Sequence, residues 1–290
     1  MNAPIIAIPG KKAPAFQKFF LYLQAKSFFK KIMRAKKSYG QHFLHRQDVA
    51  RRIAASLALS GAYEKLIEVG PGTGMLTRHL LELPFELFVV EADPDMVAVI
   101  RRDFPELDSR IIEADFLKAD LETLSDGQSF ALIGNFPYNI SSQIIFKMLD
   151  SRHLIPEMVG MFQKEVAERV VAGPGSKTYG VISVLVQAYY DCKYLFGVDK
   201  SSFNPPPKVQ SAVIRLTRKE QQNLGCDEVL FKEIVKTTFG QRRKMLRNTM
   251  KNFLPENPLL ETEFFTKRPE QLSLEDFIQL TKTVENQRSK

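Results

Sequence analysis

Residues 134–139 read GNFPYN and directly follow the apolar run FALI, so an amide, a proline and a phenol stand where a short strand should end. The Asn135 side-chain oxygen and a backbone carbonyl at Phe136 or Pro137 can accept the two N–H bonds of an exocyclic amine. Proline fixes the backbone that carries the neighbouring carbonyl, and the Tyr138 ring offers a face on which a flipped-out base can stack. The turn therefore carries groups that can position a nucleobase amine for attack. A simple β-turn with a buried tyrosine is the alternative for this tetrapeptide taken alone.

A glycine turn, EVGPGTG at 68–74, follows an earlier apolar run and precedes a helical pattern. Glycine there lets the backbone approach a ligand at the carboxyl end of a strand. A dinucleotide fingerprint would continue Gly70 and Gly72 with a third glycine or alanine at position 75. This chain has Met75 there and Gly74 beside it. The spacing favours a smaller adenosyl ligand without a pyrophosphate.

Two carboxylates follow the next two strand patterns. Glu91 ends the run ELFVVE, about twenty residues after the glycine turn, where an acid can accept both hydroxyls of a ribose. Asp115 ends RIIEAD and can accept from an adenine amino group. Together with the turn these groups favour S-adenosylmethionine, whose methyl sits on a sulfonium that leaves as a neutral group. Such a transfer needs a well-placed nucleophile rather than a metal.

Composition supports a soluble enzyme without a structural or catalytic metal. The chain has 290 residues, 44% of them apolar, and the longest apolar runs fall short of the ~20 residues of a membrane span. Cys192 and Cys226 lie far apart, and none of the four histidines forms an HExxH pair. We therefore expect a cytoplasmic protein in a reducing compartment, with no metal and no membrane partner.

Positive charge is concentrated near both ends of the chain, whose net charge is +8. Residues 1–47 contain ten Lys or Arg and no acid, and residues 232–251 contain seven Lys or Arg against Glu233 alone. Either run alone would be read as a solvated face. Two basic flanks around a balanced centre favour a polyanionic partner, with nucleic acid first.

Strand and helix patterns alternate from about residue 47 to 215, which predicts βαβ units and a doubly wound, Rossmann-like α/β sheet. The last two strand patterns, 191–198 and 211–218, are consecutive and predict a closing antiparallel hairpin, as is usual for methyltransferases. Beyond 218 the pattern is helical. We therefore expect a methyltransferase domain over 33–217 and a small all-α domain over 218–290, to which the family resemblance given below assigns RNA binding. Residues 1–32 form an N-terminal extension, either a targeting or membrane-surface helix or the product of a start codon placed too early.

These motifs resemble the ribosomal RNA adenine N6-dimethyltransferases, the small-subunit enzyme family linked to kasugamycin sensitivity. The resemblance covers about residues 36–250, and its motifs stand in the family's order: GQHFL (40–44), EVGPGTG (68–74), VEAD (90–93), EADFL (113–117), NFPYNIS (135–141), FQKEVAERVVAGPGSKTYG (162–180), FNPPPKVQSAVIRL (203–216) and the basic helix FGQRRKMLRNTM (239–250). Motifs of this number in this order are highly specific.

The resemblance implies roles for individual residues. The implied cofactor contacts are Gln41, His42, Leu44, Gly70, Gly72, Glu91, Asp115 and Asn135. The implied catalytic residues are Asn135, Pro137, Tyr138 and Phe203, with Phe203 stacking on the target adenine opposite Tyr138. The implied phosphate contacts are Lys208, Arg242, Arg243, Lys244 and Arg247. Position 42 is often Asn in the family, so the resemblance implies a contact from His42 that is either made by its backbone or different in detail.

The implied substrate is a pair of adjacent adenosines in the hairpin loop near the 3′ end of small-subunit rRNA, presented by a 30S pre-ribosomal particle to a monomeric enzyme. Three alternatives stay open. The first is a large-subunit rRNA methyltransferase of the macrolide-resistance type, which shares the cofactor and N-x-P-Y motifs. The second is a ribosome assembly factor without catalysis on the same fold. The third is a DNA adenine methyltransferase, in which an acid usually replaces Asn135.

Overall fold

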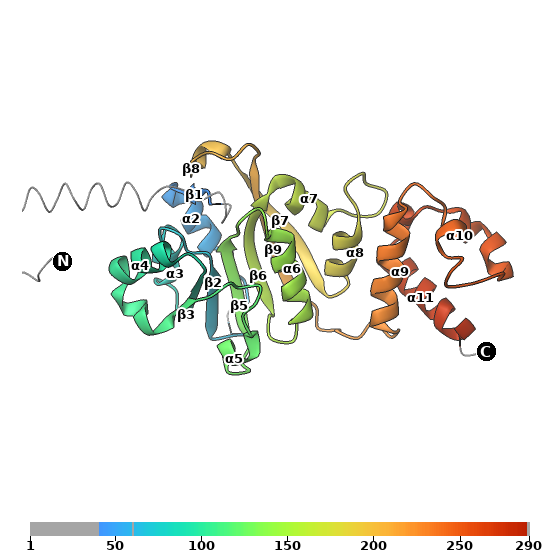
Figure 1. Cartoon of the computed structure of the whole chain (residues 1–290), viewed down its shortest axis with the longest axis horizontal. Coiled ribbons are helices and arrows are strands. Elements are labelled where there is room, and N and C mark those ends of the chain that lie inside the picture. The colour runs from blue at the N-terminus through green and yellow to red at the C-terminus, as the bar shows by residue number, and fades with distance from the viewer. Residues whose placement is uncertain (1–40, 60, 289–290) are drawn as a thin grey trace, which may run out of the picture.

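The computed structural model of the chain describes residues 41–59 and 61–288, and Figure 1 shows its elements. The predicted N-terminal extension and Gly40 of the first motif lie outside the described residues. A seven-stranded sheet has the strand order β4-β3-β2-β5-β6-β9-β7. Its strands are β2 (Lys65–Val69), β3 (Glu86–Glu91), β4 (Ile111–Glu113), β5 (Phe130–Asn135), β6 (Glu157–Gln163), β7 (Tyr190–Val198) and β9 (Ser211–Arg218). Each of the seven strand patterns in the sequence forms one of these strands.

The first five strands of the sheet are parallel, whereas β9 runs antiparallel to both β6 and β7. The predicted doubly wound sheet with a closing hairpin is therefore confirmed. The helices that alternate with the strands are α2 (Gln47–Ala54), α3 (Thr77–Leu80), α4 (Pro94–Asp103), α5 (Leu121–Ser125), α6 (Ser141–Asp150), α7 (Lys164–Val171) and α8 (Val181–Gln187). In the described part of the chain, each helix is too short or too polar to cross a membrane.

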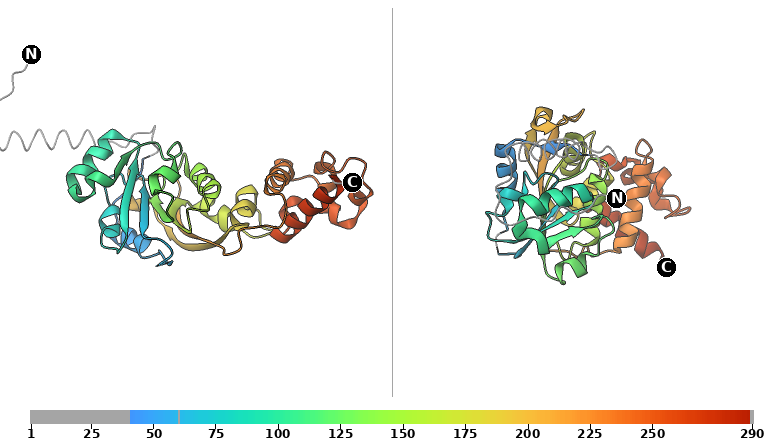
Figure 2. Two further views of the ribbon diagram at one scale, coloured as in Figure 1. Left: turned by 90° about the horizontal axis from the view of Figure 1, so that it is seen from below. Right: turned by 60° about the vertical axis from the view of Figure 1, so that its left-hand side comes forward.

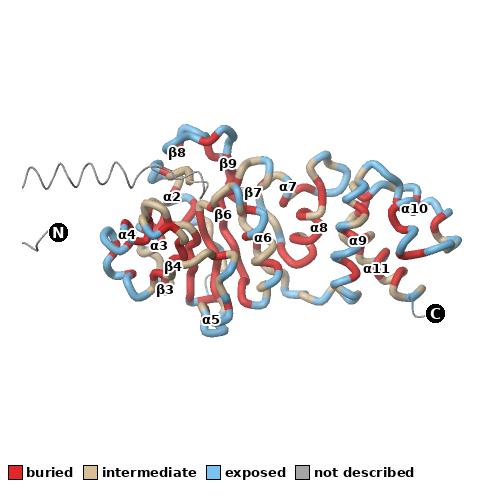
Figure 3. The backbone as a smooth tube through the Cα atoms, in the orientation of Figure 1, coloured by how far each residue is buried: buried red, intermediate tan, exposed pale blue. Residues whose placement is uncertain are grey.

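Both faces of the sheet are covered, because parallel strands connected by helices place helices on each side. In β5 the side chains alternate between two cores. Phe130 and Leu132 pack in the core beneath α6, while Ala131 and Ile133 pack in the core shared with α2 and α4. The central strands are consequently buried along their length, as Figure 3 shows. Because the central strands are held in this way, the carboxyl ends of neighbouring parallel strands lie at the same edge of the sheet.

A helical part follows the sheet and lies at the far end of the molecule, as both Figure 1 and Figure 2 show. It contains α9 (Glu228–Gly240), α10 (Leu246–Thr249) and α11 (Leu274–Arg288). Its buried side chains, such as Phe231 and Phe277, belong to the same apolar cluster as those beneath α6. The helical part therefore packs against the sheet's helices through a continuous core.

Three local features differ from the sequence patterns. The basic run QRRK does not continue a helix: α9 ends at Gly240, a poor helix former, and residues 241–244 form a turn before α10. The segment VISVLVQ forms α8 although its β-branched residues favour strands, because five of its side chains are buried against neighbouring elements. A two-stranded sheet pairs β1 (Phe43–Leu44) with β8 (Phe203–Asn204), far away in the sequence.

Glu157 ties the segment between α2 and β2 to the sheet. Its buried carboxylate accepts hydrogen bonds from the backbone N–H groups of Ala58 and Leu59 and from the Tyr63 hydroxyl, at distances of 2.8–3.2 Å. Glu157→Gln turns one of these acceptors into a donor that faces other donors. We expect the free energy of unfolding, measured in urea, to fall by about 2 kcal/mol. The exposed Glu64→Gln is the control, and an equal change in both variants would contradict this role.

Candidate active site

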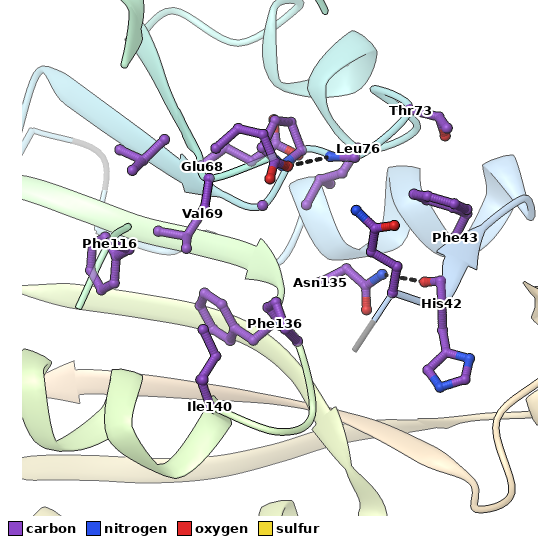
Figure 4. Close-up of a pocket in the computed structure, with 18 of the residues that line it drawn as sticks. His42, Phe43, Glu68, Val69, Thr73, Leu76, Phe116, Asn135, Phe136 and Ile140 are labelled. Atoms are coloured by element: carbon purple, nitrogen blue, oxygen red, sulfur yellow. Dashed lines mark hydrogen bonds between the residues drawn. The ribbon is translucent and has the colours of Figure 1, made fainter. Parts of the chain in front are cut away.

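A cavity of about 590 Å³ opens at the carboxyl ends of β2, β3 and β5. Figure 4 shows side chains from these strand ends and from the segment before α2 around it. Of the expected cofactor contacts, all eight line this cavity: Gln41, His42, Leu44, Gly70, Gly72, Glu91, Asp115 and Asn135. Pro137 and Tyr138 line it as well. Residues from distant parts of the sequence thus meet, because parallel strands end at one edge of the sheet.

The glycine turn is shaped by close packing. Gly72 has a φ of +55°, a conformation that glycine adopts at little cost. Gly74 has a φ of +76°, and a Cβ atom there would lie 2.2 Å from the Phe104 ring. The Gly70 N–H donates to the Val90 carbonyl at 2.9 Å, which ties the turn to β3. The backbone of Gly70 and Gly72 therefore contributes to this wall of the cavity.

Two carboxylates reach the cavity from the ends of β3 and β4. Glu91 is 8% exposed, and its oxygens accept from the backbone N–H groups of Gly72 at 3.3 Å and Asp93 at 2.9 Å. Burial raises its pKa, while these backbone hydrogen bonds oppose the shift. Asp115 accepts from the Leu117 N–H at 3.0 Å. Each oxygen keeps lone pairs for further donors, so both groups can accept from ligand hydroxyl or amino groups.

Glu68 at the end of β2 was not singled out from the sequence, although it is the first residue of EVGPGTG. It is 1% exposed and accepts from the Thr77 hydroxyl at 2.7 Å. Burial raises the pKa of Glu68 to about 8, the Thr77 hydrogen bond opposes the shift, and the Glu91 charge adds to it. The acid is therefore mostly protonated at neutral pH.

The raised pKa of Glu68 makes stability pH-dependent. Between its ordinary value near 4.5 and about 8, the folded state keeps a proton that the unfolded state releases, so stability falls as pH rises. Glu68→Gln removes this contribution. We expect the free energy of unfolding of the variant, relative to that of the wild type, to rise by about 2 kcal/mol from about pH 5.5 to about pH 7.5. Urea unfolding of both proteins at the two pH values measures this difference. Parallel pH profiles of the two proteins would show that Glu68 is ionised when folded.

The segment 41–46, here called the strap, crosses the cavity mouth. The Gln41 amide donates to Asp93 at 2.9 Å, at the start of α4. The Phe43 ring lies over the glycine turn, where a Cβ on Gly72 would be 3.2 Å from it. On the other side β1 pairs with β8. The strap thus connects the glycine turn with the segment that carries Phe203.

Asn135 and Tyr138 are held by partners that the sequence did not indicate. The Asn135 side-chain N–H donates to the His42 carbonyl at 3.1 Å, as Figure 4 shows. This bond occupies one of the two N–H groups of the amide, and the oxygen can accept from a ligand amine. The Tyr138 hydroxyl is hydrogen-bonded to Ser211 Oγ, from the start of β9. Burial raises the pKa of Tyr138, so the phenol stays neutral.

Phe136, whose role was the least clear from the sequence, anchors the tetrapeptide. Its ring is 1% exposed and packs against Phe162 with ring centroids 5.1 Å apart. The ring fills space that two glycines leave open. A Cβ atom on Gly160 would lie 2.3 Å from it, and one on Gly134 would lie 2.9 Å from it. Phe136 therefore fixes the position of the turn that carries Asn135 and Pro137.

Phe203 is placed differently from the expectation. Its ring is 3% exposed and belongs to the apolar core, because β8 pairs with β1 and sets Phe203 opposite Leu44. It does not line the cavity. Stacking requires an exposed ring face, and Phe203 presents none in this arrangement of β1 and β8.

The five basic residues expected at RNA fall into two groups. Lys208, Arg243 and Lys244 are exposed. Arg242 instead donates to the carbonyls of Tyr179 at 2.7 Å and Ser176 at 3.1 Å, joining the turn after α9 to the loop before α8. Arg247 lies 3.8 Å from Glu261. Among the contacts described, the side chains of the three exposed residues make no hydrogen bond or ion pair of this kind.

The cavity fits the cofactor that the sequence indicates. Its volume lies within the range of small-molecule sites. Carboxylates stand at two successive strand ends, and the glycine turn adds backbone groups to the lining. Apolar side chains such as Met75, Leu76 and Phe116 complete it. Hydroxyl acceptors beside an apolar slot suit an adenosyl group. In the described residues, no group of three or more His, Cys, Asp or Glu side chains is arranged so that it could hold a metal ion.

The parallel sheet with its closing hairpin and glycine turn defines a Rossmann-like methyltransferase, and comparisons with known proteins place it more narrowly. Residues 32–285 match the family model described as ribosomal RNA adenine dimethylase. A Bacteroides fragilis protein named ribosomal RNA small subunit methyltransferase A is 56% identical over 256 residues, which is 88% of this chain and 94% of that protein. A Flavobacterium johnsoniae protein of the same name is 51% identical over 253 residues, 87% of this chain and 97% of that protein.

Solved structures agree. A dimethyladenosine transferase from Plasmodium falciparum superposes with a TM-score of 0.70 and 27% identity, covering 85% of this chain and 98% of that one. The 23S rRNA methyltransferase ErmE shares the fold, with a TM-score of 0.62 and 23% identity over 83% of this chain and 99% of that one. The chain belongs to the ribosomal RNA adenine dimethylase family, and it is an S-adenosylmethionine-dependent methyltransferase.

Proposed function

We propose that this protein transfers methyl groups from S-adenosylmethionine to N6 of two adjacent adenosines in the 3′-terminal hairpin loop of small-subunit rRNA, giving a dimethyladenosine at each. The observation that carries the proposal is the hydrogen bond from the Asn135 amide nitrogen to the His42 carbonyl, at the rim of the cofactor cavity. It supports the proposal because it holds the Asn135 amide, whose oxygen can accept an N–H of an exocyclic amine. The names of the relatives, 50–56% identical, support the small-subunit rRNA as substrate.

S-adenosylmethionine, when bound, supplies an electrophilic methyl on a sulfonium. The residues that would hold it are Glu91, Asp115 and the backbone at Gly70 and Gly72. The remaining task of the protein is to hold the amine in line, which is a matter of positioning.

The amine is held by acceptors and a ring. Asn135 and a backbone carbonyl at Phe136 or Pro137 accept its N–H bonds, so that its lone pair turns out of the ring plane. Tyr138, held by Ser211, provides the stacking face for a base removed from its helix. After one transfer an N–H remains for Asn135, and after two none remains. The site therefore has a physical reason to stop at two methyl groups.

The RNA is expected to contact exposed cations in two segments, Lys208 in the loop bonded to the strap and Arg243 and Lys244 in the turn beyond α9. Recognition through shape and phosphates suits a folded rRNA. We further propose that a monomer performs the reaction in the cytoplasm, and that residues 33–217 and 218–290 act as catalytic and RNA-binding domains.

Labelled methyl transfer from S-adenosylmethionine tests this function. Substrates are undermethylated 30S particles, 50S particles and duplex DNA. We expect incorporation into 30S particles alone, in two adjacent adenosines. Incorporation only into 50S particles would establish the large-subunit alternative, and incorporation only into DNA would establish a DNA methyltransferase. Cofactor binding without transfer to any substrate would favour the assembly factor.

The two groups of basic residues predict different defects. Arg243→Ala should reduce the slope of log Kobs for rRNA binding against log salt by roughly one, as loss of one phosphate contact does. Arg242→Ala should chiefly lower the free energy of unfolding, since its guanidinium bonds backbone carbonyls. Filter binding at several salt concentrations and urea unfolding measure both. Arg101→Ala, an exposed change on α4, is the control, and an unchanged slope in Arg243→Ala would contradict the assignment.

A further inference from the structure

His42 makes three contacts on the acceptor side of the cavity. Its backbone carbonyl accepts the Asn135 side-chain N–H at 3.1 Å. Its ring lies against the Tyr138 ring, with centroids 5.3 Å apart and planes inclined by 31°. Its Nδ1 lies 2.9 Å from the Pro205 carbonyl, and since a carbonyl only accepts, Nδ1 carries the proton. One residue thus contacts both the amide and the ring of the tetrapeptide.

The direction of the His42 side chain separates it from the cofactor side. Successive side chains of an extended segment point to opposite sides. Phe43 turns toward the glycine turn, where it packs over Gly72. Figure 4 shows the His42 and Phe43 rings leaving the strap in opposite directions. The imidazole partners are accordingly Tyr138 and Pro205, and its hydrogen bonds do not go to Glu91 or Asp115.

Tyr138 needs such a support. Its hydroxyl is fixed by Ser211 at one end of the ring, and a single hydrogen bond leaves the plane of a phenol free to swing. The His42 ring beside it restricts that swing. The His42 ring is itself fixed by Pro205, in the loop that also carries Lys208. A ring held in this way at two points is preorganised to stack with a base.

We propose that His42 is a positioning residue for the methyl acceptor, holding Asn135 through its carbonyl and Tyr138 through its imidazole, and that its side chain is not a cofactor ligand. The inference rests on the proposed function, because it concerns the residues that orient the target amine. It takes up the expectation that residue 42 contacts the cofactor through its backbone, and gives the side chain a task of its own.

Three variants test the inference. His42→Ala removes the ring, His42→Phe keeps a ring without the Nδ1 bond, and His45→Ala is the matched control. His45 lies in the same strap and its ring also bonds a carbonyl of the neighbouring segment, that of Ser201, but it does not contact Asn135 or Tyr138. The measurements are kcat for methyl transfer to undermethylated 30S particles at saturating substrates and Kd for S-adenosylmethionine by calorimetry.

We expect His42→Ala to lower kcat about 10- to 100-fold, as misplacement of reacting groups does, with the cofactor Kd changed by less than about twofold. His42→Phe should recover most of kcat, and His45→Ala should match the wild type. A parallel loss of cofactor affinity in His42→Ala would make the imidazole a cofactor ligand and overturn the inference. Equal losses in His42→Ala and His45→Ala, or no loss in His42→Ala, would overturn it too. A wild type inactive on 30S particles would instead refute the proposed function, and the inference would fall with it.

Discussion

Asn135→Ala should lower kcat for rRNA methylation by about 10²- to 10³-fold while leaving the affinities for rRNA and S-adenosylmethionine within a few-fold of the wild type. As the N6 amine attacks, it develops positive charge, and its N–H groups become stronger donors. The hydrogen bond to the Asn135 oxygen therefore strengthens at that moment, while the bond from the Asn135 amide to the His42 carbonyl holds the side chain in place. An interaction that strengthens in the transition state acts on kcat rather than on binding.

Single-turnover rates and equilibrium binding to 30S particles measure the Asn135→Ala effects separately. Asn252→Ala, an exposed amide in the helical part, is the matched control and should behave as the wild type. Equal losses in rate and rRNA affinity would show that Asn135 only binds the base.

Gly160→Ala should destabilise the protein by about 3 kcal/mol and reduce methyl transfer, although Gly160 does not line the cavity. The added Cβ would lie 2.3 Å from the Phe136 ring and 2.5 Å from the Phe162 ring. Real side chains do not tolerate such distances, so the Phe136 ring must move. Because Phe136 stands between Asn135 and Pro137, its movement shifts both acceptors of the amine.

Urea unfolding and kcat at saturating substrates measure the Gly160→Ala effects. Gly173→Ala is the matched control, since a Cβ there meets nothing within 4 Å and its φ is not positive. The control should keep its stability and activity. A destabilised Gly160→Ala protein with normal kcat in its folded fraction would mean that Phe136 stabilises the core without setting the catalytic turn.

The central strands and the residues that line the cavity at their ends were predictable from sequence because their determinants are local. Apolar runs that end in a glycine or a carboxylate predict strands with ligand groups at their ends. Parallel pairing then brings Gly70, Glu91 and Asn135 to one edge. The strand patterns, the hairpin and the contribution of Glu91 and Asp115 to a common cavity were obtained in this way.

The contacts that hold the site residues in place join segments that are distant in sequence. Hydrophobic periodicity along the chain does not reveal such contacts. Pairing of β1 with β8 buries Phe203, and only the folded chain shows it. Ser211 and Gly160 carry no local signal for their effect on Tyr138 and Phe136. Likewise α8 is helical because it is packed on neighbouring elements, against the strand preference of its valines.

Mass spectrometry of small-subunit rRNA from cells with and without this protein tests the central claim most directly. We predict two adjacent N6,N6-dimethyladenosines in the 3′-terminal hairpin loop of wild-type rRNA, and unmodified adenosines at both positions in its absence. Restoring the wild-type protein should restore both modifications, whereas Asn135→Ala should not. Dimethyladenosines that persist at both positions without the protein would contradict the account.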